Sequence, residues 1–321
     1  MKTSTVGAVV IGVLLAFASV AAASGYLWSR TSSAAPATTS ARPSTDGQAL
    51  RPVPIPAGEL VTALPPDSIG QVLCQALSQD RWNLVLGGAT LREVSGDGCH
   101  LVAGALDLNL TLDRTPAALN GAKAVNIAGH PGEVEFPEPR TNARLNVHLV
   151  TAPATEQIRP YLRIGVSHTT PGVPLDELIV TVAREVVAAT MTDGPALPKV
   201  GPGRAIPPKQ VEPIADHGIV DAPWPMISWQ LCTALVAELG GTGKPEFDGR
   251  CTVRGIQAAY TDLVSPRRYP DLIAGQPALI TDDLVAVKLT GDSAQELTFT
   301  GSGRSLEAIA EHVLPALLGR S

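Results

Sequence analysis

The pattern of hydrophobic positions predicts one order of elements, and that order occurs twice along the chain. Each occurrence begins with apolar residues spaced three and four positions apart, the pattern of one buried helix face. Strictly alternating apolar residues then predict half-buried strands, and a second amphipathic helix ends each occurrence. The predicted helices are 69–77 and 175–186, then 227–239 and 306–317, and the predicted strands are 106–112, 145–149 and 162–166, then 285–289 and 297–299.

Two short segments also recur in the same order, which indicates an internal duplication. Leu-Cys-Gln-Ala-Leu at 73–77 returns as Leu-Cys-Thr-Ala-Leu at 231–235, and Ile-Ala-Gly-His-Pro at 127–131 returns as Ile-Ala-Gly-Gln-Pro at 273–277. A helix, several antiparallel strands and a closing helix describe an α+β unit. We therefore predict an α+β fold of two tandem similar units, each an antiparallel sheet with flanking helices on one face, after an N-terminal membrane helix.

The first residues predict export. An apolar stretch runs from Val6 to Leu27, and about 20 such residues span a bilayer as a helix. It is interpreted as an uncleaved signal-anchor, because it exceeds the usual core of a signal peptide and Tyr26 and Trp28 suit the membrane interface. The alternative is a signal peptide cleaved near the small residues 21–23. The first interpretation predicts a single-pass membrane protein with its C-terminal part extracytoplasmic, and the second a secreted protein.

Composition marks two further segments. Ser, Thr, Ala and Pro dominate residues 29–64 without a hydrophobic period, which predicts a disordered tether. A second break is rich in proline but also contains Ile206, Val211, Ile214, Ile219 and Val220, so we expect it to pack along one or both units. The predicted organisation is a signal-anchor or signal peptide at 1–28, the tether at 29–64, the first α+β unit at 65–194, a Pro-rich connector at 195–221 and the second unit at 222–321.

Four cysteines fall two in each unit. Four cysteines allow three pairings, and the duplication favours the disulfides Cys74–Cys99 and Cys232–Cys251. A zinc site is the alternative, but the closely spaced ligand pairs typical of such sites do not occur. Two disulfides agree with an oxidising compartment outside the cytoplasm.

The charge distribution and the missing catalytic motifs argue against some classes of function. The net charge is −6 and Lys and Arg are scattered, so the basic stripe that nucleic-acid binding requires is missing and no nucleic acid is predicted as a partner. Neither a Gly-x-Ser-x-Gly elbow nor a Ser-x-x-Lys motif occurs. The sequence therefore predicts no catalytic residue, no cofactor and no metal ligand.

The chain resembles a group of actinobacterial cell-envelope proteins of unknown function, related to the extracellular sensor domains of receptor-type Ser/Thr kinases. The features that carry the resemblance are the exported N-terminus, the Pro/Ser/Thr tether, the helix with Leu73-Cys74-Gln75-Ala76-Leu77, a second cysteine at the start of a strand, the turn at 127–131 and the closing helix. The resemblance covers 65–194 and 222–321, and it implies a ligand- or partner-binding role at the cell surface. It supplies no site residues.

A few polar and aromatic residues are candidates for ligand contact. His130 lies in the Gly-x-Pro turn, although surface histidines usually have no such role. Trp224 and Trp229 flank the start of the second unit and either contact a ligand or partner or pack in the core. Arg304 precedes the last helix, where it could help to bind an anion, or where Ser305 simply caps the helix. The candidate ligand contacts are therefore His130, Glu133, Trp224, Trp229 and Arg304.

Two function classes follow. The first is a membrane-tethered, non-catalytic binding or interaction module of the cell envelope, whose partner is an envelope protein, a lipid or a glycan. The alternative is an envelope hydrolase without a recognisable motif. A pocket that joins His130, Glu133 and Arg144 would favour the enzyme, whereas a broad apolar groove would favour lipid binding.

Overall fold

The computed structural model describes residues 50–169, 174–209, 218–291 and 294–319. The predicted membrane segment and most of the predicted tether lie outside the described residues. Within the described ranges, no helix has both the length and the apolar character to cross a bilayer.

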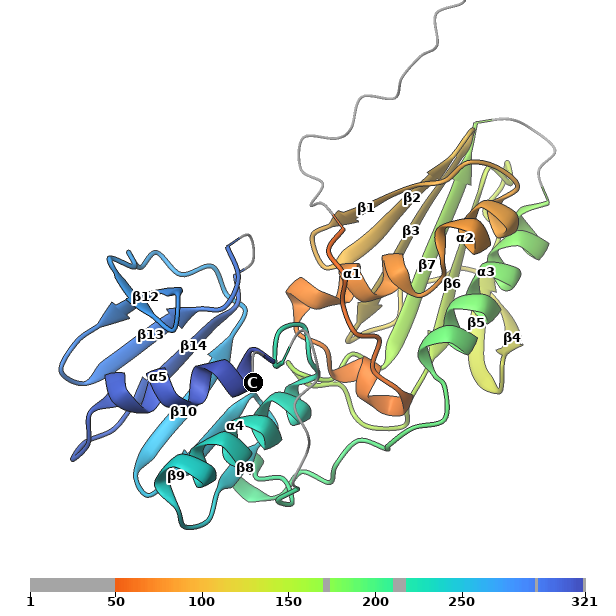
Figure 1. Ribbon diagram of the computed structural model, residues 1–321. Helices are drawn as coiled ribbons and strands as arrows, with labels where there is room; N and C mark the ends of the chain where they lie inside the picture. Colours follow the sequence, from red (N-terminus) through yellow and green to blue (C-terminus); the bar gives the residue numbers. More distant parts are fainter. Residues whose placement is uncertain (1–49, 170–173, 210–217, 292–293, 320–321) are drawn as a thin grey trace, which may run out of the picture. The chain divides into compact units, whose positions relative to one another are not determined.

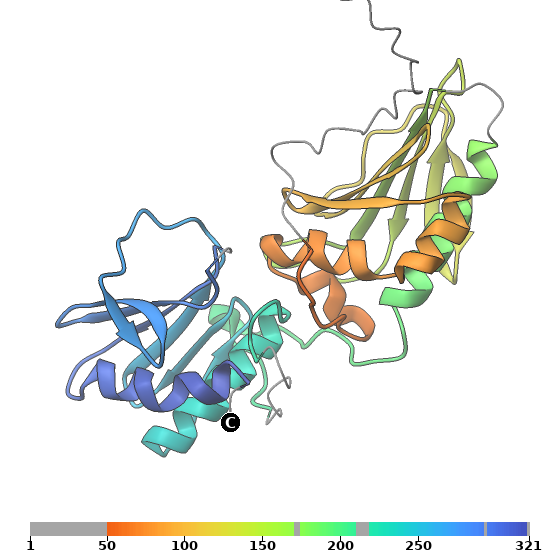
Figure 2. The same ribbon diagram turned by 45° about the horizontal axis from the view of Figure 1, so that its top comes forward.

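The first unit is built on an antiparallel sheet of seven strands, in the order β1-β2-β3-β7-β6-β5-β4. Its α-helices lie on one side of this sheet, as Figures 1 and 2 show from two directions, with α1 and α3 against the strands and α2 against α3. The elements are the 3₁₀ helix η1 (Gly58–Ala63), α1 (Pro66–Gln75), α2 (Gln79–Leu86), β1 (Leu91–Ser95), β2 (Gly98–Ala103), β3 (Leu106–Asp113), β4 (Lys123–Ile127), β5 (His130–Glu135), β6 (Asn142–His148), β7 (Tyr161–His168) and α3 (Leu175–Thr190).

The second unit has a second antiparallel sheet of seven strands, in the order β11-β12-β13-β14-β10-β9-β8. Two helices cover one side of it and contact each other. A 3₁₀ turn, η2 (Pro202–Arg204), precedes the unit, and its elements are α4 (Trp224–Leu239), β8 (Lys244–Glu246), β9 (Arg250–Val253), β10 (Ile256–Thr261), β11 (Asp271–Ile273), β12 (Gln276–Ile280), β13 (Leu284–Lys288), β14 (Glu296–Thr300) and α5 (Leu306–Leu317).

Each strand of the first sheet has a counterpart at the same place in the second sheet. Read from one edge, β1-β2-β3-β7-β6-β5-β4 corresponds to β8-β9-β10-β14-β13-β12-β11, and α1 and α3 correspond to α4 and α5. Among the described α-helices, only α2 lacks an equivalent. The predicted α+β class and the internal duplication are confirmed.

The recurring Ile-Ala-Gly-x-Pro segments are tight hairpin turns. Ile127 pairs with His130 and Ile273 with Gln276, so two residues form each loop. In the first loop both residues have positive φ, 50° at Ala128 and 92° at Gly129. Two positive values are typical of a type I′ turn, whose twist matches that of paired strands. The segments recur because each unit needs this backbone geometry at the same hairpin.

Both predicted disulfides are present. Cys74 of α1 is bonded to Cys99 of β2, with Cα atoms 5.1 Å apart, and Cys232 of α4 is bonded to Cys251 of β9, with Cα atoms 5.3 Å apart. Each bond joins the first helix of a unit to its sheet. The cores on either side are mainly aliphatic, as the low aromatic content requires.

The structure corrects the predicted start of the first helix. The apolar pattern predicts a helix from residue 69, but α1 begins at Pro66, with Pro65 as N-cap and no side-chain capping bond. A proline at the first helical position needs no partner for an N–H, so it suits this place. In the second unit, Ser305 does cap α5 through the amide of Ala308, 3.2 Å away.

The predicted tether is too long at its carboxyl end. Residues 58–63 form η1, and Leu60, Val61 and Leu64 are buried. Gly58 has a φ of +64°, and a Cβ there would meet the backbone of Gly194 at 2.7 Å. The burial of these apolar residues offsets the entropy cost of ordering the segment. Their pattern is hard to recognise in the sequence because they directly follow a low-complexity stretch.

The connector packs as predicted where it is described. Ile206, Ile219 and Val220 are all buried, and Ala205 forms a β-bridge with Glu246 at the edge strand β8. Val211 and Ile214 lie outside the described residues. The connector is thus part of the folded protein at both of its described ends.

Candidate functional site

The largest of the described cavities has a volume of about 870 Å³, and we call it the connector cavity. This volume falls in the range of about 300–1,000 Å³ that is typical of small-molecule sites. The β6–β7 loop and the connector form most of the wall. The lining residues are Glu59, 151–153, 155–158, 197–200, Arg204 and Phe247.

An apolar cluster lies directly beneath this cavity. Ile158 and Phe247 belong to both the cavity wall and the cluster. Trp229 of α4 is also a member of the cluster. Leu197 packs against the same cluster, and its amide donates to Glu59 Oε2 at 2.9 Å, which fixes the connector against η1. The floor of the cavity is therefore held by buried side chains, whereas Val200 at its edge is 50% exposed.

Charged groups lie at the edge of the connector cavity. Arg204 is held by Asp248, with Nη1 and Oδ2 2.7 Å apart. The hydrogen bond and the charge of Asp248 raise the pKa of the Arg204 guanidinium. Lys199 and Glu156 also line the cavity and are exposed. The wall thus combines a mainly apolar surface with a few charged side chains of both signs.

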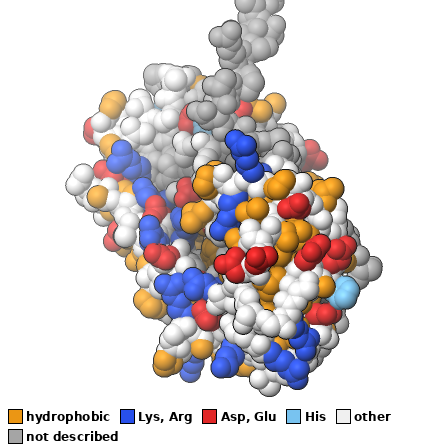
Figure 3. All heavy atoms as spheres, turned by 90° about the vertical axis from the view of Figure 1, so that its left-hand side faces the viewer, with side chains coloured by type: hydrophobic (Ala, Val, Ile, Leu, Met, Phe, Trp, Pro, Cys, Tyr) orange, Lys and Arg blue, Asp and Glu red, His pale blue; other side chains and the backbone are white. Residues whose placement is uncertain are grey.

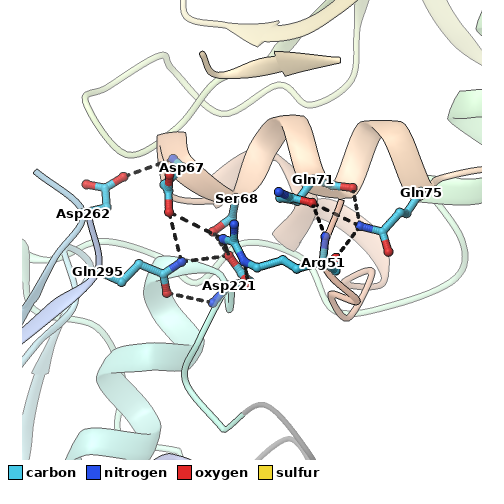
Figure 4. Close-up of polar contacts among 8 residues, drawn as sticks. All are labelled: Arg51, Asp67, Ser68, Gln71, Gln75, Asp221, Asp262 and Gln295. Carbon is cyan, nitrogen blue, oxygen red and sulfur yellow. Dashed lines mark hydrogen bonds and ion pairs between the residues drawn. The ribbon is translucent and has the colours of Figure 1, made fainter. Parts of the chain in front are cut away.

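A second group of polar side chains surrounds Asp221, which is 1% exposed. Its carboxylate accepts from Arg51 Nε at 3.0 Å, Ser68 Oγ at 2.8 Å and Gln295 Nε2 at 2.8 Å, and the amide of Asp221 donates to Gln295 Oε1 (Figure 4). Asp67 lies 3.5 Å from Arg51. We call these five residues the Asp221 cluster. It joins side chains from both units and from the segment before η1.

Two groups near this cluster have raised pKa values. Partial burial raises the pKa of Asp262, whose carboxylate accepts a long 3.5 Å bond from the amide of Asp67 (Figure 4). Burial also raises the pKa of Tyr260 well above its usual value, and its hydroxyl has no hydrogen-bond partner within the described chain. The arrangement is suited to holding segments of the chain together.

The structure does not bring the predicted ligand contacts together. His130 and Glu133 lie on β5, and the residue opposite Arg144 is Glu135, not Glu133. The connector cavity is lined by other residues, so the His130–Glu133–Arg144 pocket that would favour an enzyme is not among the described cavities. Arg304 lies in a small hollow before α5, beside Asp282 and Glu307. That acidic surrounding does not suit an anion.

The two tryptophans pack rather than face solvent. Trp224 is 7% exposed and meets the ring of Tyr260 edge to face, with centroids 5.4 Å apart. Trp229 donates from Nε1 to the carbonyl of Pro207 at 2.9 Å, and the ammonium of Lys209 lies 5.1 Å from its ring centroid. Trp229 therefore supports the floor of the connector cavity without lining it.

The histidines of the first sheet are separated along its strands. His100 on β2 contacts Asp107 at 3.0 Å, and His148 on β6 stacks on Tyr161. Among the described residues, no group of three or more His, Cys, Asp and Glu side chains is placed to hold a metal ion. The face in Figure 3 shows acidic, basic and hydrophobic side chains interspersed.

Sequence reasoning missed both the connector cavity and the Asp221 cluster. Neither has a local signal, because Glu59, Phe247 and the 151–158 loop are distant in the sequence, as are Arg51 and Asp221. The one available hint was the run of apolar residues within the connector, which marked it as a packed segment.

No family model, no curated protein and no solved structure matches this chain.

Proposed function

We propose that the protein is an extracytoplasmic, membrane-tethered binding module that takes an apolar or amphiphilic ligand of lipid type in the connector cavity. The observation that carries the proposal is a cavity of about 870 Å³ with a mainly apolar wall. Apolar surface favours the burial of hydrocarbon, and a sugar would leave polar groups without partners there. A lipid is therefore preferred to a glycan or a protein segment.

Compartment and tethering fit the same proposal. Two disulfides suggest an oxidising environment outside the cytoplasm. We propose that residues 1–28 anchor the chain, as the resemblance to tethered envelope proteins implies. The intact mass of the protein recovered from membranes is expected to include these residues. A mass lacking everything up to Ala23 would instead indicate a cleaved signal peptide and contradict the anchor.

Ligand binding is expected to depend on the apolar edge of the cavity. Val200→Asp places a carboxylate in the cavity wall, where a bound hydrocarbon chain would displace the water that hydrates it. We therefore expect at least about a tenfold loss of affinity for the lipid. The measurement is photo-crosslinking of the full-length protein in envelope membranes with a photoreactive fatty acid, followed by mapping of the labelled peptides. Labelled peptides are expected to contain residues 151–158 or 197–204, and unlabelled fatty acid should compete.

Val264→Asp is the matched control, because Val264 is also an exposed valine, 88% accessible, outside the cavity. It is expected to leave labelling unchanged. Equal competable labelling of the cavity peptides in the wild type and in Val200→Asp would overturn the proposed site. Labelling that unlabelled fatty acid does not compete would overturn lipid binding itself.

A further inference from the structure

The loop that forms one wall of the connector cavity is longer than its counterpart in the second unit. A backbone hydrogen bond closes each loop, from the amide of Leu149 to the carbonyl of Pro160 at 2.8 Å in the first unit, and from Leu289 to Gln295 at 3.0 Å in the second. The two loops join equivalent strands, β6 to β7 and β13 to β14. The first loop is about twice as long. The cavity wall that it forms therefore has no counterpart of equal length in the second unit.

A tight turn in this longer loop carries an exposed carboxylate. The amide of Thr155 donates to the carbonyl of Ile158 at 3.1 Å, and Thr155 Oγ1 accepts from the amides of Gln157 and Ile158 at 3.2 and 3.0 Å. Ile158 is only 5% exposed and belongs to the apolar cluster beneath the cavity. Glu156 lies inside this turn, is exposed and lines the cavity. The turn therefore fixes the backbone of Glu156 at the cavity wall.

A second anchored segment carries an exposed ammonium group. The amide of Leu197 donates to Glu59 Oε2 at 2.9 Å, and the amide of Gly201 donates to the carbonyl of Ala205 at 2.7 Å. Lys199 lies between these two anchors, is exposed and lines the cavity. Within the described parts of the chain, the Lys199 side chain has no ion pair or hydrogen bond. Its ammonium group is therefore free to meet a ligand.

Arg204 places a second cation at the same edge of the cavity. Asp248 holds it through Nη1 at 2.7 Å, but the Arg204 side chain is still 52% exposed. A guanidinium group has five N–H donors, and Asp248 is the acceptor that Arg204 has within the described chain. The other N–H groups of Arg204 can therefore donate to a ligand beside Lys199.

Glu156 and Arg204 face the same cavity without forming an ion pair. The pKa of the Arg204 guanidinium is raised first by the hydrogen bond and the charge of Asp248, and to a smaller extent by the charge of Glu156. The two side chains are thus near enough to interact, although no ion pair joins them in the described part of the chain. Opposite charges that are held apart at one cavity suit a ligand that carries both charges itself.

We propose that the ligand of the connector cavity is a zwitterionic amphiphile of the phospholipid type, whose headgroup carries a phosphate and a primary amine. This inference rests on the proposed function, because the hydrocarbon chain lies against the apolar wall. The phosphate accepts from Lys199 and from the free N–H groups of Arg204, and the ammonium group donates to Glu156. A phosphate without the amine would leave Glu156 beside an anion. An amine without the phosphate would meet the two cations.

The test measures how well three competitors displace the photoreactive fatty acid from the full-length protein in phosphatidylcholine nanodiscs. The competitors have a hydrocarbon chain of the same length. Lysophosphatidylethanolamine carries both headgroup charges, lysophosphatidylglycerol has the phosphate without the amine, and hexadecylamine has the amine without the phosphate. Lysophosphatidylethanolamine is expected to displace the probe at a concentration at least about fivefold lower than either of the others.

The outcomes separate this inference from the lipid site on which it rests. Equal displacement by the three competitors would overturn the preference for a zwitterion and would leave the lipid site in place. Labelling of the cavity peptides that no competitor reduces would overturn the lipid site, and the headgroup assignment with it.

Glu156→Gln is the decisive variant, because it removes one charge from an exposed side chain and keeps its shape. Labelling by the fatty acid is expected to persist, whereas the advantage of lysophosphatidylethanolamine over lysophosphatidylglycerol should fall to less than about twofold. In Lys199→Gln, its advantage over hexadecylamine should fall instead. Glu133→Gln is the matched control, because Glu133 is an exposed glutamate of β5 outside the cavity, and it should keep the wild-type order. A wild-type preference in Glu156→Gln would overturn the headgroup assignment.

Discussion

Asp221→Ala is expected to lower the free energy of unfolding by about 3 kcal/mol, the lower end of the cost of removing one partner of a buried ion pair. Asp221 is 1% exposed and accepts hydrogen bonds from Arg51, Ser68 and Gln295. Its loss leaves the Arg51 guanidinium with Asp67 alone, 3.5 Å away. That remaining carboxylate is the reason for expecting the lower end of the range.

Backbone conformation adds to this cost. Asp221 has a φ of +60°, a left-handed conformation that Asp and Asn adopt more readily than Ala. Asp221→Asn keeps the shape and the backbone preference, so it is expected to cost less than the alanine variant. The loss of stability in Asp221→Asn reports the missing charge. The additional loss in Asp221→Ala reports the backbone strain and the lost hydrogen bonds.

Chemical denaturation of the purified protein measures both variants. Asp97→Ala is the control, because Asp97 is 48% exposed and also contacts an arginine, Arg159, at 2.8 Å. Because Asp97 is half-exposed, its contact with Arg159, whose side chain is 14% exposed, is expected to contribute less to stability than the fully buried contacts of Asp221. An Asp221→Ala variant as stable as Asp97→Ala would show that the Asp221 cluster does not hold the fold together.

Replacing both Cys74 and Cys99 with alanine is expected to lower the free energy of unfolding by about 3 kcal/mol. The two residues are 25 positions apart, and a crosslink of this span restricts the unfolded chain by about that amount in the chain-entropy account. Both cysteines are buried, at 0% and 1% exposure. Double replacement avoids leaving a free thiol in the core.

The second disulfide gives a comparison within the same chain. Cys232 and Cys251 are 19 positions apart, so their double alanine variant is expected to lose a similar amount, again about 3 kcal/mol. Thermal and denaturant unfolding of both variants, beside the reduced wild type, measure these losses. A loss below about 1 kcal/mol in either variant would mean that its crosslink adds little to the stability of its unit.

The duplicated fold could be predicted from the sequence because its strands alternate and its turns demand particular residues. The 106–112 alternation became β3, and the two Ile-Ala-Gly-x-Pro segments became equivalent hairpins. α2 was missed although Ser78 caps it and Gly87 ends it in a left-handed conformation. Its only buried residues are Trp82 and Leu86, and Leu84 is 68% exposed, so the apolar pattern is weak.

The candidate site could not be predicted in the same way. Residues were chosen for their chemical character, and rare aromatic residues such as Trp224 turned out to fill the core of a chain that has few of them. The connector cavity depends instead on loops that meet only after both sheets form.

Arg51 is among the first described residues of the chain, and it is bound on three sides. Its amide donates to Gln71 Oε1 at 3.1 Å, its carbonyl accepts from Gln75 Nε2 at 2.7 Å, and its guanidinium holds Asp221 (Figure 4). A pulling force applied at the amino terminus would therefore reach α1 and Asp221 before it reached a strand of either sheet. A mechanical load on the chain would therefore act first on the polar contacts of Arg51, and only later on the hydrogen bonds of a β-sheet.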